Sequence, residues 1–486
     1  MAAIQVGEFV VSQNLSLTFS RVSGDFNPLH TDPILARRYQ FGSTVVHGVH
    51  ATLKALDLYF EGIRKVVSLS SIRAVYSKPI RHGDVVNVMC SKRDSGDITL
   101  ELYCRGSRSQ LIKLRLSSDL PSEKSVVNRK HEGGEPGTSC PDLMFEGSLG
   151  QSGVVPLFWN NALMTEIFPA LTRFVPAYQS CLLLGTTHIV GMHCPGLNSV
   201  YGSFDLSFCD TTDEFEQNLA YEVTQADSRF SRVIISLKHS VIHGEVEAFY
   251  RPRPVSQSAF MAIKSLVDPE QFLGQTALVV GGSRGLGEIT SKLIAAGGGQ
   301  VVLTYSSGQD DAEAIVEDVQ KSGGQCEAVH YNVLSSGVAK PLVLGDRHFT
   351  HIYYFASPKI EKGRLSIWDS ALFETFTEFY LAGLAKLLEY FVVDSAYRKH
   401  GVKLLLPSTE FLDNPADGFS EYVACKAAME SFASQFQDKH SSWRICTPRL
   451  PRLSTDQTAS VVQASPIETA QTILAQLLKL DRDKHQ

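Results

Sequence analysis

The chain has 486 residues, of which 43% are hydrophobic and 20% are charged, and its net charge is −6. These are the proportions of a globular chain with about three domains of roughly 100–200 residues each. The weakly acidic balance argues against nucleic-acid binding, which requires a basic surface. Neither an apolar run of about 18 residues nor a signal-peptide pattern is visible, so we expect no contact with a membrane.

The cysteines and histidines are informative mainly through what their spacing excludes. The 9 cysteines are scattered and form no C-x-x-C pair. In a long chain this favours reduced thiols and a cytoplasmic location. The 15 histidines form no H-E-x-x-H or comparable pattern, so we expect no metal site.

The patterning divides the chain into three segments. A polar stretch that contains glycine and proline, residues 119–143, is predicted to be a linker. On either side of it, residues 1–118 and 144–255 contain short runs of alternating apolar and polar residues, which is typical of strands, and look like two related α+β units. From 266 to 486, apolar strands alternate with helical stretches, which predicts an α/β, doubly wound parallel sheet of the Rossmann type.

The densest motif lies within residues 24–48. It reads Gly24-Asp-x-Asn-Pro-Leu-His30, followed by Asp32-Pro33, Ala36, Phe41-Gly42 and Val45-Val-His-Gly48. A carboxylate and an imidazole that face the same substrate can add or remove water, one as acid and the other as base. This pattern closely resembles that of the MaoC-like, (R)-specific enoyl-thioester hydratases and dehydratases, which implies a hot-dog fold.

The resemblance also implies roles for single residues. Asp25 and His30 occupy the positions of the catalytic dyad, and Asn27 matches a residue that helps to position the water and the dyad. Gly48 stands at a predicted helix start, where a free backbone N–H can stabilise the thioester oxygen. The structural alternative is that Asn27-Pro28 forms a turn that Asp25 and His30 merely cap.

The middle segment, residues 144–255, resembles a second hot-dog core without the Asp-x-Asn-Pro-x-His run. We therefore expect a double hot dog in which this half is catalytically silent and shapes the acyl tunnel. His188 and His193 are interpreted as structural, because no carboxylate stands at the dyad spacing.

The last segment carries a glycine-rich turn and a distant Tyr-x-x-x-Lys motif. Val280-Gly-Gly-Ser-Arg-Gly-Leu-Gly287 lies between a predicted strand and a predicted helix, where glycines let the backbone approach a pyrophosphate. Tyr422 and Lys426 follow about 140 residues later. Together these motifs resemble the short-chain dehydrogenase/reductase family.

That resemblance implies proton transfer by Tyr422, while Lys426 lowers the pKa of the tyrosine and holds the ribose. Ser408 is expected to orient the substrate, with Thr409 as the alternative. The expected cofactor contacts come from the glycine turn and two later loops: Gly281, Ser283, Arg284, Gly285, Leu286, Gly287, Asn332 and Ala356. Arg284, together with the lack of an acidic residue after the strand near 301–307, favours NADP, with NAD as the alternative.

The same segment departs from its family at several positions. The threonine that usually opens the turn is Val280, and the asparagine of the proton relay is replaced by Tyr380. Phe355–Pro358 stands in place of Asn-Asn-Ala-Gly, Asn332-Val333 in place of Asp-Val, and Pro448-Arg449 in place of Pro-Gly. A catalytically silent, reductase-like domain that binds nucleotide or a carrier protein therefore remains an alternative.

The two resemblances together predict a bifunctional enzyme of fatty-acid-like or polyketide-like biosynthesis. It would reduce a 3-oxoacyl thioester and dehydrate the (3R)-hydroxyacyl product to the trans-2-enoyl thioester. The acyl group would be carried by acyl carrier protein or coenzyme A, and the reductase-like domain is expected to form a homo-oligomer by analogy alone. The same pair of activities running in the oxidative direction is the enzymatic alternative.

Overall fold

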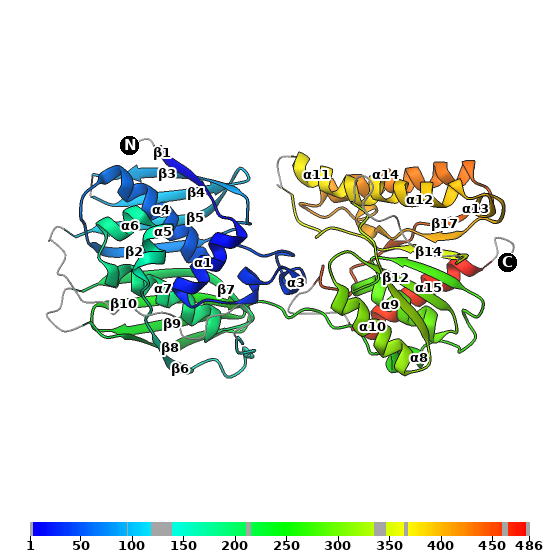
Figure 1. Cartoon of the computed structure of the whole chain (residues 1–486), viewed down its shortest axis with the longest axis horizontal. Coiled ribbons are helices and arrows are strands. Elements are labelled where there is room, and N and C mark those ends of the chain that lie inside the picture. The colour runs from blue at the N-terminus through cyan, green and yellow to red at the C-terminus, as the bar shows by residue number, and fades with distance from the viewer. Residues whose placement is uncertain are drawn as a thin grey trace. The chain divides into compact units, whose positions relative to one another are not determined.

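The computed structural model describes residues 3–94, 96–117, 139–209, 215–334, 347–363, 368–458 and 465–482. The chain forms two compact units, Met1–Arg253 and Pro254–Gln486 (Figure 1). Of the predicted linker 119–143, residues 119–138 lie outside the described residues. The domain boundaries predicted inside the first unit therefore stay predictions.

The first unit is built on one antiparallel sheet of ten strands, in the order β1-β3-β4-β5-β2-β7-β10-β9-β8-β6. The strands are β1 (Ile4–Val10), β2 (Leu69–Tyr76), β3 (Val85–Lys92), β4 (Ile98–Cys104), β5 (Ser107–Leu116), β6 (Ser152–Pro156), β7 (Ser199–Phe208), β8 (Asn218–Asp227), β9 (Arg232–His239) and β10 (Ile242–Tyr250). Both halves repeat the same strand order, and antiparallel pairing of β2 with β7 joins them.

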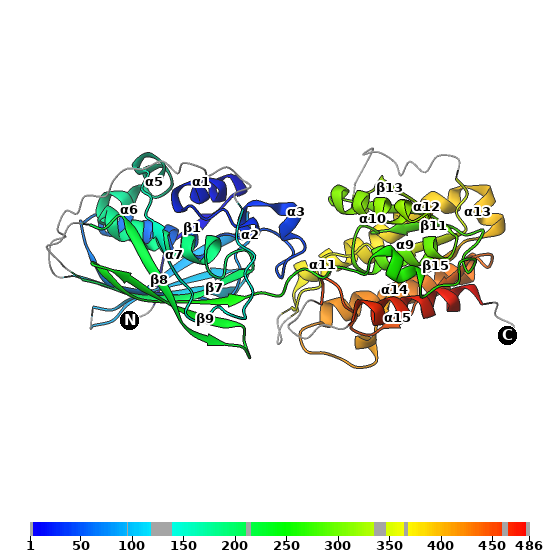
Figure 2. The same cartoon turned by 90° about the horizontal axis from the view of Figure 1, so that it is seen from below.

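Each half contributes one long apolar helix, α4 or α7. The helices of this unit are α1 (Gln13–Ser23), α2 (Pro28–Thr31), α3 (Pro33–Ala36), α4 (Gly48–Ile63), α5 (Asn161–Ile167), α6 (Pro169–Phe174) and α7 (Ala177–Met192). Figure 2 shows the helices gathered on one face of the sheet. A single hydrophobic core, which includes Phe60, Phe168 and Phe204, runs through both halves. This arrangement confirms the predicted double hot dog.

The second unit has a parallel sheet in the order β13-β12-β11-β14-β15-β17, the strand order of a Rossmann fold. Its strands are β11 (Thr276–Val280), β12 (Gln300–Tyr305), β13 (Gln325–His330), β14 (His351–Tyr354), β15 (Lys403–Leu405) and β17 (Arg444–Cys446). Two short parallel strands, β16 (Ser408–Thr409) and β18 (Arg449–Leu450), follow β15 and β17. The predicted doubly wound sheet is confirmed.

Helices cover both faces of this parallel sheet, over two separate hydrophobic cores (Figure 1). The helices are α8 (Phe260–Lys264), α9 (Gly285–Ala296), α10 (Gln309–Lys321), α11 (Ser370–Thr377), the π-helix η1 (Glu378–Gly383), α12 (Leu384–Val393), α13 (Ser395–His400), the 3₁₀-helix η2 (Glu410–Leu412), α14 (Ser420–Lys439) and α15 (Pro466–Asp481). Ligands of such sheets bind beyond the carboxyl ends of the strands, where the glycine turn after β11 lies.

The structure bears on two further expectations from the sequence, which concern membrane-spanning segments and the state of the cysteines. Among the described residues, no helix is both long and apolar enough to cross a membrane. All nine cysteines are free thiols. The cytoplasmic location stays a prediction.

Candidate active sites

The first candidate site begins where α1 ends. Gly24 closes the helix with φ 77°, a left-handed conformation that glycine adopts without strain, and its N–H donates to Ser20 O at 2.8 Å. The chain then turns inward, so that Asp25 is only 2% exposed.

Both carboxylate oxygens of Asp25 accept hydrogen bonds. Oδ2 accepts from the Thr187 hydroxyl at 2.6 Å, and Oδ1 accepts from the backbone N–H of Asn27 at 3.1 Å. Burial raises the pKa of Asp25 to about 7, although both hydrogen bonds favour the charged form and oppose this rise. Near neutral pH the carboxyl group can therefore either hold or release a proton.

Asn27 fixes the loop that carries Asp25. Its Oδ1 caps α2 by accepting from Leu29 N–H at 3.0 Å. Its Nδ2 donates to the backbone oxygens of Gly191 and Gly196, at 3.1 and 3.0 Å. Because both ends of the amide are engaged with the backbone, the side chain of Asn27 anchors the loop to the second half of the unit.

His30 is held as a neutral imidazole. Its Nδ1 lies 2.8 Å from Val45 O, a pure acceptor, so this nitrogen carries the hydrogen and Nε2 keeps its lone pair. The ring stacks on that of His47 with the centroids 3.7 Å apart. Burial lowers the pKa of His30 to about 3, which leaves Nε2 able to accept a proton at neutral pH.

The start of α4 completes this site. The Nε2 atom of His47 lies 3.1 Å from Asp25 O, which ties the helix start to the loop that carries the dyad. Gly48 is the first residue of the helix, and its N–H makes no hydrogen bond with another described residue. First-turn amides have no partner within their own helix, so this N–H can serve an oxyanion. A Cβ on Gly48 would lie 3.0 Å from the Tyr76 ring, so the position is tightly packed.

Asp25, His30 and His47 also stand close enough to raise the question of a metal ion. Each offers one ligand atom, and these atoms lie within 4.8 Å of one another. However, both carboxylate oxygens of Asp25 accept hydrogen bonds from Thr187 and Asn27, and the Nε2 atom of His47 lies 3.1 Å from Asp25 O. A carboxyl group and an imidazole in this arrangement can carry out acid–base chemistry.

The second half contributes two residues that the sequence did not predict, Thr187 and Gly191, both on α7. Thr187 supplies the hydroxyl that contacts Asp25, and a Cβ on Gly191 would overlap the Asp25 carboxylate. No local motif marks these positions, and only the packing of one half against the other reveals them. By contrast, His188 and His193 face each other, with their Nε2 atoms 3.3 Å apart.

The second candidate site begins at the glycine turn after β11. Gly281 has φ 78° and Gly285 has φ 59°, conformations that favour glycine. A Cβ on Gly281 would lie 2.8 Å from Ala356 N, and one on Gly287 would overlap Gly281 O. The turn is therefore packed backbone against backbone, and α9 begins at Gly285 with its N–H groups facing this end of the sheet.

The other predicted cofactor residues have different surroundings. Arg284 Nη1 lies 3.6 Å from Asp456 Oδ2, so its positive charge is paired within the protein. Asn332 Oδ1 accepts from Leu334 N–H at 3.0 Å and shapes the loop after β13. Ser283 is buried, and Leu286 packs against the core beneath α9.

Tyr422 and Lys426 lie one turn apart on α14. Burial raises the pKa of Tyr422 to about 12, and a hydrogen bond with the Thr409 hydroxyl opposes this rise. The Nζ atom of Lys426 donates to Pro407 O at 2.7 Å and lies 3.8 Å from the centroid of the Tyr380 ring. Burial lowers the pKa of Lys426 to about 7.

Ser408 and Thr409 point in different directions, because successive side chains of a strand alternate. The Ser408 hydroxyl donates to Glu430 Oε1 at 2.5 Å. Arg449 stands in place of the glycine of the family's Pro-Gly, and its Nη2 atom donates to Glu430 Oε2 at 2.7 Å. Thr409 is the residue that contacts Tyr422.

Tyr380 fills the position of the family's asparagine. It lies in the π-helix η1, a type of distortion that is frequent at functional sites. Its hydroxyl lies 2.6 Å from Ser357 Oγ, and its ring packs beneath Lys426. The ring of Tyr380 therefore contacts the ammonium group of Lys426, and its hydroxyl forms a hydrogen-bonded pair with that of Ser357.

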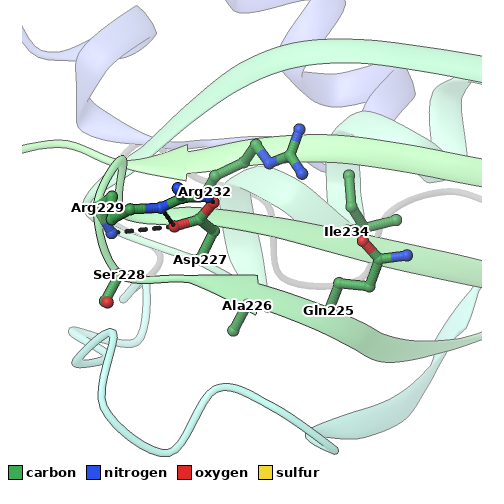
Figure 3. A pocket seen from close by; sticks show the side chains of 7 residues that line it. All are labelled: Gln225, Ala226, Asp227, Ser228, Arg229, Arg232 and Ile234. Carbon is green, nitrogen blue, oxygen red and sulfur yellow. Dashed lines mark hydrogen bonds and ion pairs between the residues drawn. The ribbon is translucent and has the colours of Figure 1, made fainter.

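The hollow beside the β8–β9 hairpin contains none of the predicted site residues (Figure 3). The side chains that line it include Ile234 and an exposed ion pair in which Arg229 Nη2 lies 2.7 Å from Asp227 Oδ2. An exposed pair of this kind contributes little binding energy. We assign no function to this hollow.

Two known families match the two units. The family described as MaoC like domain matches residues 4–105, and the family described as short chain dehydrogenase matches residues 275–344. The chain joins a MaoC-like domain to a short-chain dehydrogenase domain. The first match includes Asp25 and His30, and the second includes the glycine turn and Asn332.

Three known proteins whose names describe reductases are similar to parts of the chain. The hydroxynaphthalene reductase-like protein Arp2 of Metarhizium robertsii is 25% identical over 175 residues, which are 35% of this chain and 63% of that protein. The fatty acyl-CoA reductase of Acinetobacter baylyi is 27% identical over 224 residues, 43% of this chain and 75% of that protein. A 3-oxoacyl-[acyl-carrier-protein] reductase of Synechocystis sp. is 38% identical over 69 residues, 14% of this chain and 28% of that protein. The chain thus spans less than two thirds of the first relative.

Solved structures of both kinds are similar to parts of the chain. One described as a MaoC-like dehydratase covers 51% of this chain and 97% of its own, with 12% identity and a TM-score of 0.38. The 3-oxoacyl (acyl-carrier-protein) reductase of Agrobacterium tumefaciens with NADP bound covers 42% of this chain and 87% of its own, with 18% identity and a TM-score of 0.36. Similarity at this level carries no conclusion about activity.

The fit of Asp25 against α7 can be tested by adding a methyl group. We expect Gly191→Ala to lower the free energy of unfolding by about 1–3 kcal/mol, the usual cost of overpacking, because its Cβ overlaps the carboxylate. Gly62→Ala is the matched control, since Gly62 also lies in a helix and its Cβ would meet nothing within 4 Å. The free energy of unfolding of this control should rise by up to about 1 kcal/mol, because alanine favours the helix more than glycine does. Urea unfolding measures both, and equal effects would contradict the packing described.

Proposed function

We propose that the chain is a bifunctional enzyme that reduces 3-oxoacyl thioesters with NADP(H) and dehydrates the (3R)-hydroxyacyl product to the trans-2-enoyl thioester. The observation that carries this proposal is the meeting of a buried carboxyl, a neutral imidazole and a free helix-start N–H in the MaoC-like domain. Asp25, His30 and Gly48 supply these groups. The direction of synthesis and the (3R) configuration are part of the proposal.

The dyad performs the water chemistry by exchanging one proton. In hydration, His30 Nε2 accepts a proton from water as the oxygen attacks the β carbon, and Asp25 delivers a proton to the α carbon. Dehydration uses the same positions in reverse. The Gly48 N–H stabilises the negative charge that develops on the thioester oxygen. In both directions the active dyad holds one proton in total.

The reductase-like domain supplies a proton donor for carbonyl reduction. Bound NADPH would supply the hydride. Tyr422 gives its phenolic proton to the carbonyl oxygen, and the positive charge of Lys426 stabilises the phenolate that remains. We assign the orientation of the substrate oxygen to Thr409 rather than Ser408; the hydrogen bond from the Ser408 hydroxyl to Glu430 supports this assignment.

The glycine turn fits a dinucleotide. A Cβ at Gly281 or Gly287 would collide with backbone, so the tight turn requires glycine at both positions. The N–H groups of Gly281 and Gly282 donate to Thr304, and the amides of the first turn of α9, which begins at Gly285, would meet a pyrophosphate. After β12 the chain continues with Ser306 and Ser307, which offer no carboxylate to a ribose 2'-hydroxyl. Arg284 would exchange Asp456 for a 2'-phosphate. These features support NADP over NAD.

The second candidate function is a dehydratase whose reductase-like domain only binds nucleotide or a carrier protein. The hydrogen bond between Ser408 and Glu430 and the replacement of asparagine by Tyr380 favour it. In either case the substrate is an acyl thioester of acyl carrier protein or coenzyme A. The two functions differ in whether NADPH is consumed.

The decisive experiment measures NADPH oxidation by the purified chain with a 3-oxoacyl thioester, followed by mass analysis of the acyl product. We expect NADPH loss and an enoyl product. Asp25→Asn should keep NADPH oxidation but accumulate the hydroxyacyl thioester. Tyr422→Phe should lose reduction by about 10²-fold or more, the usual contribution of a positioned acid, and keep hydration of the enoyl thioester. Hydration without NADPH loss in the wild type would favour the second function.

A pair of adjacent variants tests which hydroxyl orients the ketone. We expect Thr409→Val to lower kcat for reduction by at least about tenfold, because the only hydroxyl that contacts Tyr422 from β16 is lost. Ser408→Ala should cost much less, since that hydroxyl serves Glu430. Steady-state kinetics on the same thioester measures both, and the reverse ranking would return the role to Ser408.

The pH dependence of hydration tests the protonation state of the dyad. Between the pKa of His30 at about 3 and that of Asp25 at about 7, the dyad holds one proton, on Asp25. We therefore expect kcat/KM to fall as the pH rises through about 7, where Asp25 loses this proton. Rates that rise through the same range would instead identify ionised Asp25 with neutral His30 as the active form.

A further inference from the structure

Helix α7 of the second half presents a cradle to the Asp25 carboxylate. The Thr187 hydroxyl donates to Oδ2 at 2.6 Å, and the side chain of Thr187 is only 3% exposed. One turn later, Gly191 leaves the space that the carboxylate occupies. Residues four apart lie on the same face of a helix, so the hydroxyl and the space form one surface.

The same stretch also holds the loop that carries Asp25. The Gly191 and Gly196 backbone oxygens accept from the Asn27 amide, and Met192 Sδ lies 3.3 Å from Phe26 N. The two residues that follow Asp25 are therefore attached to the second half. A half that only shaped an acyl tunnel would not need these contacts.

We propose that Thr187 is a positioning residue of the hydratase site, whose hydroxyl orients the Asp25 carboxyl and stabilises its ionised form. The inference rests on the proposed function of that site. It makes the second hot-dog half, which lacks a dyad of its own, an integral part of the active site of the first.

The electrostatic effect of Thr187 can be separated from that of its neighbours. His30 of α2, His47 at the start of α4, Cys140 before β6 and Tyr201 on β7 lie near Asp25, and Arg251 lies near His30. Thr187 carries no charge, so replacing it changes none of these. Its O–H favours the carboxylate, so its removal raises the pKa of Asp25 above about 7.

The test compares pH profiles of enoyl-thioester hydration by the full chain. We expect Thr187→Val to move the alkaline fall of kcat/KM to higher pH by about one unit or more, the worth of one hydrogen bond to a charged group. Thr187→Ser should restore the wild-type profile, because serine keeps the donor. Thr186→Val is the matched control: its hydroxyl donates to Leu183 O at 2.7 Å on the same helix, and the profile should not move.

A second readout does not depend on activity. The carboxyl groups can be titrated by infrared or ¹³C NMR spectroscopy, with Asp25→Asn to assign the signal of Asp25. We expect the pKa of Asp25 measured in this way to be higher in Thr187→Val than in the wild type. Thr187→Cys, with a weaker donor of similar size, should shift it in the same direction if the valine variant fails to fold. An unmoved titration in these variants would overturn the proposal. If the pKa of Asp25 rises in these variants but the chain has no hydratase activity, the effect of Thr187 on Asp25 is confirmed and the proposed function is refuted instead.

Discussion

The MaoC-like domain depends on the burial of one carboxyl group, that of Asp25. An ionised carboxylate taken out of water is costly unless hydrogen bonds replace the lost hydration. Here one donor is local, the N–H of Asn27, and the other, Thr187, is 162 residues away. The α1–α2 loop and α7 must therefore keep one fixed register. The continuous core and the central pairing of β2 with β7 maintain that register.

Burial acts in opposite directions on the two members of the dyad. It raises the pKa of Asp25 to about 7 and lowers that of His30 to about 3, because in each case the charged form is disfavoured. Between pH values of about 3 and about 7, the result is a neutral acid beside a neutral base. In the proposed mechanism, a single low-dielectric environment thus prepares both the proton donor and the proton acceptor, because the two groups respond to burial in opposite directions.

The sequence predicts those parts of the sites that lie within short motifs. Asp25, Asn27, His30 and Gly48 fall within one run of residues, and the family resemblance names them together. Thr187 could not be predicted, because a threonine on a buried helix carries no local signal and its role arises only when the two halves pack. The sequence predicted Ser408 with Thr409 as the alternative, and the register of β16, on which this choice depends, is not visible in the sequence. The two fold classes were predicted from the family resemblance, from alternation and from the βα repeat, whereas the strand orders of the sheets come from the structure.

The departures in the short-chain dehydrogenase domain are connected to one another. Arg449 replaces a glycine and holds Glu430, which in turn holds Ser408, while Tyr380 replaces an asparagine and packs beneath Lys426. A buried lysine costs stability because its charge is removed from water, and burial lowers its pKa to about 7. A domain kept only for its fold would gain stability from an apolar residue at this position. The presence of a buried lysine one turn from Tyr422, with its ammonium group 3.8 Å from the centroid of the Tyr380 ring, therefore supports the proposed reductase site.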